Sequence, residues 1–317
     1  MTKDDAMVRI PAAVSSAAKA FFRNAGPIGY RAATEDTIGA IRDETRDGFA
    51  AASIAAQQTL TEQVKDIEIA GVQVQEVVPK GYDAANDDRA ILYFFGGGHI
   101  VGSPFEDLPV SAGLAHRLGV KVYAPYYRRA PEDPFPAAAE DAGAVYEALI
   151  GRFGPRRLAV AGESAGGNLA LTALLDARDG GLPLPAAAAL LSPWSDLTDT
   201  GDTASAAEGF DPTLVYEKSL RSAALAYAGG RALDDPRVSP LYGDYRPGFP
   251  PTLITTGTRD LFLSDCARLS TKMRQSGVDA SLHLWEGMWH VFEFYPDVPE
   301  ASQSLDEVAS FIAGHLA

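Results

Sequence analysis

Cysteine is almost absent from this sequence. Its 317 residues include only one, Cys266, so no internal disulfide can form and the sequence implies no oxidising compartment. Cys266 falls in a stretch with helical spacing over 264–276 and has no histidine near it in the sequence. We therefore expect this thiol to be a packing residue.

Basic residues and long apolar runs are also scarce. There are 27 Lys and Arg against 42 Asp and Glu, which gives a formal net charge of −15. This balance argues against a nucleic acid or an anionic membrane as partner, and it favours neutral or cationic substrates, although solubility alone would also explain it. No apolar run reaches the roughly 18 residues needed to span a bilayer, and residues 1–10 lack the apolar core of a secretory signal. We expect a cytoplasmic protein.

What the sequence does contain is a long alternation of strand-like and helix-like segments. Their apolar spacing predicts strands over 67–78, 90–94, 120–125, 157–161, 186–191, 252–256 and 280–285, with helices over 108–118, 136–150, 165–177, 264–276 and about 301–315. Alternating strands and helices predict an α/β fold with a mostly parallel central sheet flanked by helices.

Two stretches depart from this alternation. Residues 1–60 are rich in alanine and predict two helices, one with Ala17, Phe21 and Phe22 on a single face and one over 37–56, separated by a break at 26–29. Residues 196–235 contain no strand-like run, look helical over 214–228, and are too long for a simple connection. We predict that 1–60 and 196–235 form a helical cap over a catalytic core made of 61–195 and 236–317.

The pentapeptide Gly162-Glu163-Ser164-Ala165-Gly166 matches the nucleophile-elbow pattern G-x-S-x-G. In such an elbow a strand turns sharply into a helix, so that the serine hydroxyl projects above the sheet. The predicted strand before it and the predicted helix after it provide this context, and Ser164 is the candidate nucleophile. An ordinary glycine-rich turn between strand and helix is the alternative.

A second glycine-rich loop, Phe95-Gly96-Gly97-Gly98-His99, follows the predicted buried strand over 90–94. Its bare backbone N–H groups are suited to stabilising the oxyanion of a tetrahedral intermediate. A phosphate-binding loop is the competing interpretation, but neither G-x-x-x-x-G-K-[ST] nor a helix-opening G-x-G-x-x-G is present.

Acyl transfer also needs a base and a carboxylate that orients it, and in α/β-hydrolases these follow the serine in the order acid, then histidine. Of the five histidines, His99 and His116 precede Ser164, His283 lies in a predicted strand, and His315 is expected to be exposed near the C-terminus. His290 remains, in a loop after the last predicted strand. Asp260 comes just past the strand over 252–256 and is favoured over Asp265, which lies within the next helix; a role in a turn or helix cap is its alternative.

At this point the sequence resembles the hormone-sensitive-lipase-like group of α/β-hydrolase carboxylesterases, from about Ile91 to the C-terminus. The matching blocks occur in one order along the chain and are Gly96-Gly97-Gly98 with Gly102-Ser103, Tyr127-Arg128-Arg129-Ala130-Pro131-Glu132, Pro134-Phe135-Pro136-Ala137-Ala138, Gly162 to Ala170, Ser192-Pro193-Trp194-Ser195-Asp196-Leu197-Thr198, Asp235-Pro236, Ser239-Pro240-Leu241, Pro250-Pro251-Thr252 and Gly287-Met288-Trp289-His290-Val291-Phe292.

The resemblance implies a capped ester hydrolase, often a homodimer, that acts on short to medium acyl esters without a metal or cofactor. It implies Ser164 as nucleophile, His290 as base and Asp260 as the carboxylate that orients the base. The oxyanion donors would be the backbone N–H groups of Gly97, Gly98 and Ala165.

Some positions depart from the family pattern. Phe95 stands where a histidine usually holds the oxyanion loop, Glu163 replaces an aspartate, and Asp260 is followed by Leu261-Phe262 rather than Pro-Leu. Phe95 has no hydrogen-bond donor in its side chain, so we expect an active enzyme with a differently braced loop.

Other interpretations stay open at this stage. A lactone or amide hydrolase with the same three residues is one, a non-catalytic small-molecule receptor is another, and a lyase or dehydratase using the same loop is a third. The substrate cannot be inferred from the sequence, because aromatic side chains of the cap region either line the pocket or pack in the core: Trp194, Phe210, Tyr216 and Tyr227.

Overall fold

The computed structural model of the chain describes residues 10–25, 32–206 and 210–317. Within these residues an eight-stranded sheet has the order β1-β2-β4-β3-β5-β6-β7-β8. Its strands are β1(Thr61–Ile69), β2(Val72–Pro79), β3(Ala90–Phe94), β4(Lys121–Pro125), β5(Leu158–Glu163), β6(Ala187–Leu191), β7(Thr252–Gly257) and β8(Ala280–Trp285). The pairs from β4 through β8 are parallel, and β2 runs antiparallel to both of its neighbours. The predicted α/β class and mostly parallel sheet are confirmed.

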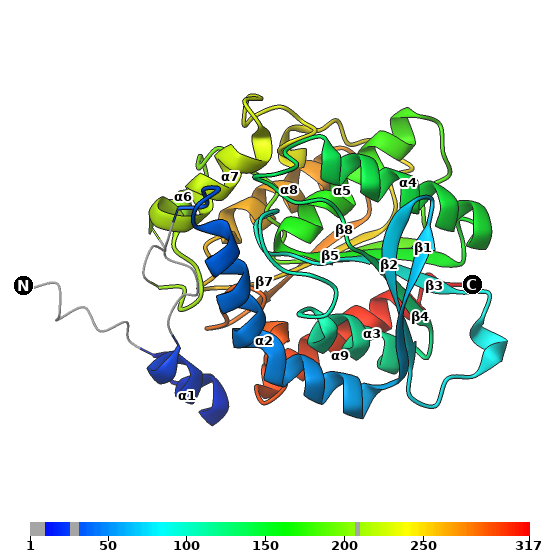
Figure 1. Cartoon of the computed structure of the whole chain (residues 1–317), viewed down its shortest axis with the longest axis horizontal. Helices are drawn as coiled ribbons and strands as arrows, with labels where there is room; N and C mark the ends of the chain where they lie inside the picture. Colours follow the sequence, from blue (N-terminus) through cyan, green and yellow to red (C-terminus); the bar gives the residue numbers. More distant parts are fainter. Residues whose placement is uncertain (1–9, 26–31, 207–209) are drawn as a thin grey trace, which may run out of the picture.

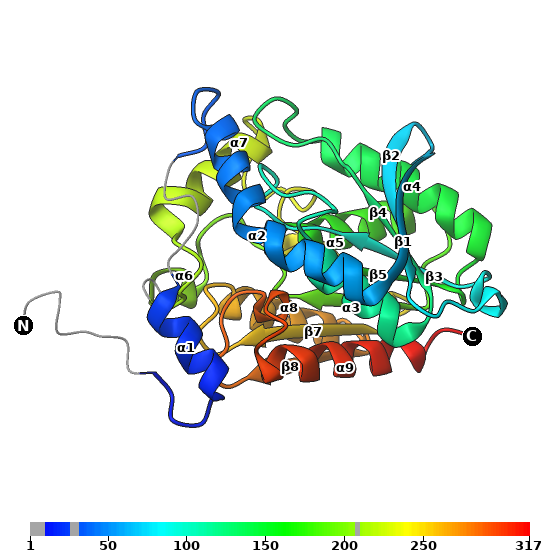
Figure 2. The same cartoon turned by 60° about the horizontal axis from the view of Figure 1, so that its bottom comes forward.

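Helices cover both faces of this sheet (Figures 1 and 2). On one face lie α3(Leu108–Leu118) and α9(Pro299–Ala313), and α2(Ile38–Leu60) packs against α3. On the other lie α4(Ala137–Phe153), α5(Ser164–Asp179) and α8(Leu263–Gln275). The strands β3 and β5 to β7 are buried between these layers, which explains why the sequences of β3 and β6 are continuous apolar runs.

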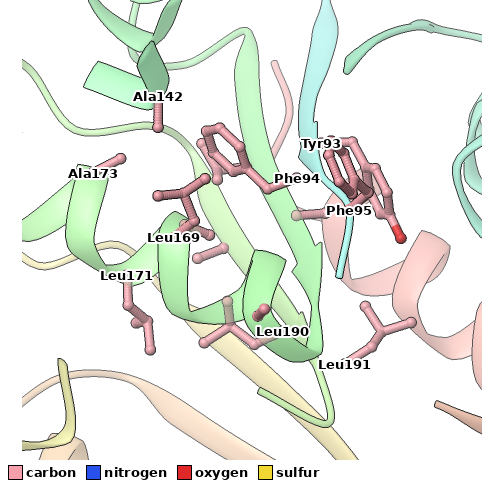
Figure 3. Packing of buried hydrophobic residues seen from close by; sticks show 14 of the residues in the cluster. Tyr93, Phe94, Phe95, Ala142, Leu169, Leu171, Ala173, Leu190 and Leu191 are labelled. Atoms are coloured by element: carbon pink, nitrogen blue, oxygen red, sulfur yellow. The ribbon is translucent and has the colours of Figure 1, made fainter. Parts of the chain in front are cut away.

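Fully buried side chains pack where α5 lies against the middle of the sheet. Figure 3 shows side chains of β3, α5 and β6 meeting there, including Phe94, Leu169 and Leu190. All three are fully buried. This packing fixes the position of the first turn of α5, at which the candidate nucleophile stands.

One predicted strand is wrong. The stretch 67–78 is the end of β1 and most of β2, joined by a two-residue hairpin in which Ile69 pairs with Val72. The turn residues Ala70 and Gly71 both have positive φ, 50° and 79°. Such a turn matches the twist of a hairpin, but Ala-Gly lacks the asparagine or aspartate that usually marks it, and the apolar alternation continues through it.

The segments outside the alternation are helical in their described parts. They include α1(Ser16–Asn24), α2, α6(Asp202–Ala206), a single π-helical turn over Tyr216–Leu220 and α7(Arg221–Ala228), and no strand occurs in the described residues of 196–235. Figures 1 and 2 show α1, α2, α6 and α7 grouped at one side of the sheet. The break predicted at 26–29 lies outside the described residues, as do residues 1–9. Three short 3₁₀ helices, Ala84–Asn86, Pro240–Tyr242 and Phe292–Phe294, complete the elements.

No helix among the described residues is long and apolar enough to cross a membrane.

Candidate active site

Ser164 stands at an abrupt turn between β5 and α5. Strand and helix follow each other without a linker, and Ser164 adopts φ 51°, a left-handed conformation that costs energy for a non-glycine residue. The turn also requires backbones to approach closely. A Cβ at Gly162 would lie 2.5 Å from the carbonyl oxygen of Gly166, and one at Gly166 would lie 2.0 Å from that of Phe94. The two glycines of the motif are therefore required by space, as an elbow demands.

Asp260 and His290 lie at the carboxyl ends of the neighbouring strands β7 and β8. His290 Nδ1 is 3.1 Å from Asp260 Oδ1, and both side chains are buried. Asp260 also accepts hydrogen bonds from Thr256 Oγ1 (2.8 Å) and from the Phe262 backbone N–H (2.9 Å). Burial alone would raise the pKa of Asp260, but the charge and hydrogen bond of the His290 ring, together with hydrogen bonds from Ser192 and the Phe262 N–H, hold it below its usual range. The carboxylate is therefore ionised beside the ring. It also accepts the hydrogen bond of the turn from the Phe262 N–H, so the contact with His290 and the role in the turn occur together.

The glycine loop after β3 lies beside Ser164. Gly97 and Gly98 have φ of 96° and 62°, and both line the same cavity as Ser164 and His290. Ala165 is buried in the first turn of α5, where backbone N–H groups have no partner within the helix. Of the residues that the sequence singled out, Gly97, Gly98, Ser164 and His290 thus line one cavity, and Asp260 lies behind His290.

Phe95 is held by an aromatic partner instead of a hydrogen-bonding ring. Its side chain is buried and stacks on Tyr127, with ring centroids 4.1 Å apart and planes 11° from parallel. The Tyr127 hydroxyl donates to the Phe95 carbonyl oxygen at 2.7 Å. Farther along the loop, Arg42 of α2 donates to the Ile100 carbonyl oxygen at 2.8 Å and pairs with Glu132. The glycine loop is therefore held by a stacked ring and by hydrogen bonds to its carbonyl oxygens, and not by a histidine side chain.

The cavity has a volume of about 970 Å³. Its walls come from α1, α2, the glycine loop, the elbow, the loop after β8 and residues between 213 and 223. Small or apolar side chains predominate on α1 and α2: Ala17, Ala20, Phe21, Ile41, Phe49, Ala52 and Ala55. A pocket of this size, mainly apolar with a few polar groups at one place, is typical of small-molecule sites.

Comparison with known proteins agrees with this geometry. A sequence model of the alpha/beta hydrolase fold matches residues 91–294. An acetyl-hydrolase of Streptomyces hygroscopicus is 36% identical over 251 residues, 76% of this chain and 83% of the relative. An esterase of Acinetobacter venetianus is 32% identical over 256 residues, 80% of this chain and 83% of the relative.

Solved structures give the same result. One esterase, 31% identical, superposes with a TM-score of 0.90 and covers 97% of this chain and 96% of its own. An esterase from the bacterial hormone-sensitive lipase family, 34% identical, superposes with a TM-score of 0.79 over 89% of this chain and 98% of its own. The chain belongs to the α/β-hydrolase fold family. Within it, this chain is a hormone-sensitive-lipase-like carboxylic ester hydrolase, which confirms the predicted family and enzyme class.

Beside the elbow, this α/β-hydrolase buries two carboxyl groups that the sequence analysis did not single out as a pair. Glu163 and Asp107 share a hydrogen bond, and Tyr93 Oη donates to Asp107 Oδ2 at 2.8 Å. Burial raises the pKa of Asp107 to about 8, with the negative charge of Glu106 adding to the shift. Burial, and then the negative charge of Asp107, raise the pKa of Glu163 well above its usual range. Glu163 also accepts from the Gly96 N–H and lies directly against Gly96, where a Cβ would be 2.0 Å from Oε1. The pair therefore holds the glycine loop to the elbow.

The remaining histidines of the hydrolase lie away from the Asp260–His290 pair. His99 is fully buried and stacks on Tyr227, with centroids 3.7 Å apart, and burial lowers its pKa to about 3. His116 is exposed on α3, and His283 lies on β8, 2.6 Å from Glu307. His315, expected to be exposed, is partly buried, because its ring packs on Phe311 and contacts that residue's carbonyl oxygen.

The remaining candidates from the sequence are an aspartate and a cysteine in α8 and four aromatic side chains. Asp265 is buried in α8 and accepts from the Asp196 N–H (3.2 Å), and Cys266 is a buried free thiol. Trp194, Tyr216 and Tyr227 are buried and Phe210 is exposed, and none of these four lines the described cavity. The described residues contain no cluster of three or more His, Cys, Asp or Glu arranged to hold a metal.

Proposed function

We propose that Ser164, His290 and Asp260 are the catalytic triad of this carboxylic ester hydrolase. The observation that carries the proposal is the 3.1 Å contact between His290 Nδ1 and Asp260, at the wall of the cavity that Ser164 also lines. The strained backbone of Ser164 supports it, because such strain is kept where it exposes a reactive group.

The chemistry follows from these positions. His290 takes the proton of the Ser164 hydroxyl as the serine oxygen attacks the ester carbonyl, and then gives it to the departing alcohol. Asp260 holds the ring with Nδ1–H toward the carboxylate, which leaves Nε2 free to accept that proton, and it stabilises the imidazolium that forms. A water molecule, activated by the same ring, then cleaves the acyl-enzyme and releases the acid.

We propose the backbone N–H groups of Gly97, Gly98 and Ala165 as oxyanion donors. The two glycines have bare backbones on the cavity wall, and Ala165 opens a helix whose N-terminus favours negative charge. Because these donors are backbone groups, the absence of a histidine at position 95 does not remove them.

For the substrate, we propose short to medium acyl esters. The supporting features are the size and apolar lining of the cavity, together with relatives named acetyl-hydrolase and ethyl acetate hydrolase. A panel of p-nitrophenyl esters of graded chain length should show kcat/KM highest for short or medium chains. Lactones and anilides belong in the same panel, because a lactone or amide hydrolase with this triad is the alternative.

The decisive experiment is labelling with a fluorophosphonate. The wild-type protein should become labelled and lose its p-nitrophenyl butyrate hydrolysis, and Ser164→Ala should lose both labelling and activity, by at least about 10³-fold in kcat. Ser270→Ala, at a buried serine of α8 remote from the cavity, is the matched control and should behave as wild type. Absence of labelling in folded wild-type protein would instead favour the non-catalytic receptor.

The cap and core division at residues 60, 195 and 235, a homodimer and a cytoplasmic location stay predictions. Light scattering coupled to size exclusion tests the dimer, and cell fractionation tests the location.

A further inference from the structure

Residues 196–235, called here the cap segment, contain a buried carboxylate, Asp211, that contacts the loops bearing Asp260 and His290. Only 3% of Asp211 is exposed. Its Oδ2 accepts from the backbone N–H of His290 at 3.1 Å and from that of Leu261, the residue after Asp260, at 3.3 Å. One oxygen atom therefore joins the histidine loop to the acid loop.

The other oxygen of Asp211 fixes the cap itself. Oδ1 accepts from Thr213 N–H (2.8 Å), Thr213 Oγ1 (2.7 Å) and Leu214 N–H (3.2 Å). Thr213 and Leu214 both line the cavity. The cap wall that meets a bound ester and the loops that carry Asp260 and His290 are thus joined through one side chain.

The backbone that Asp211 contacts is strained. Val291, next to His290, has φ 43°, which is an outlier for a β-branched residue. Its N–H donates to Ser192 Oγ at 3.2 Å, and Ser192 itself has φ 47°. Strained conformations persist only where surrounding contacts determine them, and the Asp211 bond to the His290 N–H is one of these contacts.

Burying the ionised carboxylate of Asp211 so close to Asp260 also costs electrostatic free energy. Burial, and then the negative charge of Asp260, raise the pKa of Asp211 to about 6, while the His290 ring acts in the opposite direction. Burial, and then the negative charge of Asp211, raise the pKa of Tyr295, which lines the same cavity. A second carboxylate buried near Asp260 is a poor choice for stability alone, which favours a role in the site.

We propose that Asp211 is a positioning residue that couples the cap to the triad: it holds the His290 and Asp260 loops in register and adds negative charge beside the imidazole. The proposal rests on the proposed function of His290 and Asp260. A substrate that orders the turn at Thr213 and Leu214 would thereby also order the histidine loop.

The test is Asp211→Asn, compared with Asp196→Asn. The hydrogen bonds to both oxygens of Asp211 come from N–H or O–H donors. In an asparagine the NH₂ group would replace one of these oxygens and would face donors, so the hydrogen bonds on that side would be lost. Asp196 is as buried, belongs to the same segment and also accepts from neighbouring N–H and O–H groups, but it pairs with Arg268 away from the cavity. Steady-state kinetics with p-nitrophenyl butyrate and fluorophosphonate labelling rates are measured from pH 5 to 9.

Asp211→Asn should lower kcat about ten- to a hundredfold and slow labelling in parallel, with KM within about twofold, because a small misplacement of a catalytic group has effects of this size. The loss should be largest above about pH 6, where Asp211 is ionised in the wild type, and smaller below it, where the wild-type side chain is itself protonated. Asp196→Asn should keep wild-type kcat and profile. Unchanged kcat in Asp211→Asn, or an equal loss in Asp196→Asn, would overturn the proposal.

A measurement on the wild-type protein covers the case in which Asp211→Asn does not fold. Hydrogen exchange at the amides of Leu261 and His290, corrected for intrinsic rate, should lose at least about fivefold protection between pH 7.5 and 5, as Asp211 becomes protonated. Hydrogen-exchange protection that stays the same between pH 7.5 and 5 would contradict the proposal that Asp211 holds the two loops together. Failure of the proposed function looks different, because wild-type protein would then show neither labelling nor hydrolysis.

Discussion

At the scale of single residues, the departure at Phe95 is balanced by Tyr127. The ring of Tyr127 stacks on Phe95 while its hydroxyl donates to the Phe95 carbonyl oxygen, so one side chain supplies both packing and a hydrogen bond to the loop. Tyr127→Phe keeps the stack and removes only the hydroxyl. Loss of one such bond, about 1.4 kcal/mol if it is expressed in the transition state, predicts a roughly tenfold lower kcat with little change in KM.

The control for this variant is Tyr146→Phe. Tyr146 is also buried and its hydroxyl donates to the Pro183 carbonyl oxygen at the same 2.7 Å, but it lies in α4 away from the cavity. Kinetics and thermal unfolding of both variants separate loop bracing from general stability. Equal kcat in the two variants would show that the hydroxyl of Tyr127 does not support the oxyanion loop.

The sequence identified the residues whose chemistry or spacing is distinctive. The sharp turn at Ser164 was predictable from its glycines, and the contact between His290 and Asp260 from chain order and their place after strands. Asp211 was not, because a single aspartate in a segment without periodicity looks like any loop residue. Its role depends on contacts 79 and 50 positions away in the sequence, which no local pattern records. Glu163 was noticed only as a mild change, since its partner Asp107 is also distant in sequence.

At the scale of elements, the Asp107–Glu163 pair joins the start of α3 to the end of β5 and makes stability depend on pH. A carboxyl group whose pKa is raised to about 8 keeps its proton in the native state, whereas the unfolded chain releases it near pH 4. Between these values the unfolded state binds fewer protons, so the free energy of unfolding falls as pH rises, by up to about 1.4 kcal/mol per pH unit for one proton. This contribution is complete below pH 4 and is lost by pH 8.

Asp107→Asn removes the titrating group and keeps its shape. We expect the decline in the free energy of unfolding between pH 5 and pH 8, measured by urea denaturation, to be smaller in this variant than in wild type. Asp279→Asn, at the exposed residue just before β8, is the control and should follow the wild-type slope. If the free energy of unfolding of Asp107→Asn falls with pH as steeply as that of the wild type, Asp107 is not the group that holds the proton.

Elements were predictable where apolar periodicity is long, as in α3 and β8, whose predicted bounds coincide with the observed ones. The β1–β2 hairpin was missed because the alternation of apolar residues continues through its turn. An alternation without interruption looks the same for one long strand as for two strands joined by a tight turn. The arrangement of α1 and α2 around the cavity depends on tertiary packing, for which the alanine-rich N-terminal sequence provides little signal.

At the scale of the whole molecule, α1 packs on the loop that carries His290, more than 260 positions later in the chain. Phe21 stacks on Trp289 with centroids 4.1 Å apart and planes 5° from parallel, Phe22 meets the edge of the same ring, and the Ser15 N–H donates to Glu300 at 2.7 Å. Phe21 also lines the cavity. The N-terminal helix thus forms a cavity wall and supports the histidine loop from behind.

Phe21→Ala should therefore affect binding more than folding. Loss of a partly buried ring and its stack predicts about 2 kcal/mol of lost α1 docking, while the sheet and its helices remain covered. We expect KM to rise severalfold, most for the longest acyl chains, and Trp289 emission to shift to the red as solvent reaches its ring. Arg23→Ala, on the exposed face of the same helix, should change neither. If Phe21→Ala instead lowered KM evenly across all chain lengths, α1 would be acting as a barrier to entry, and its place as a wall of the acyl site would have to be given up.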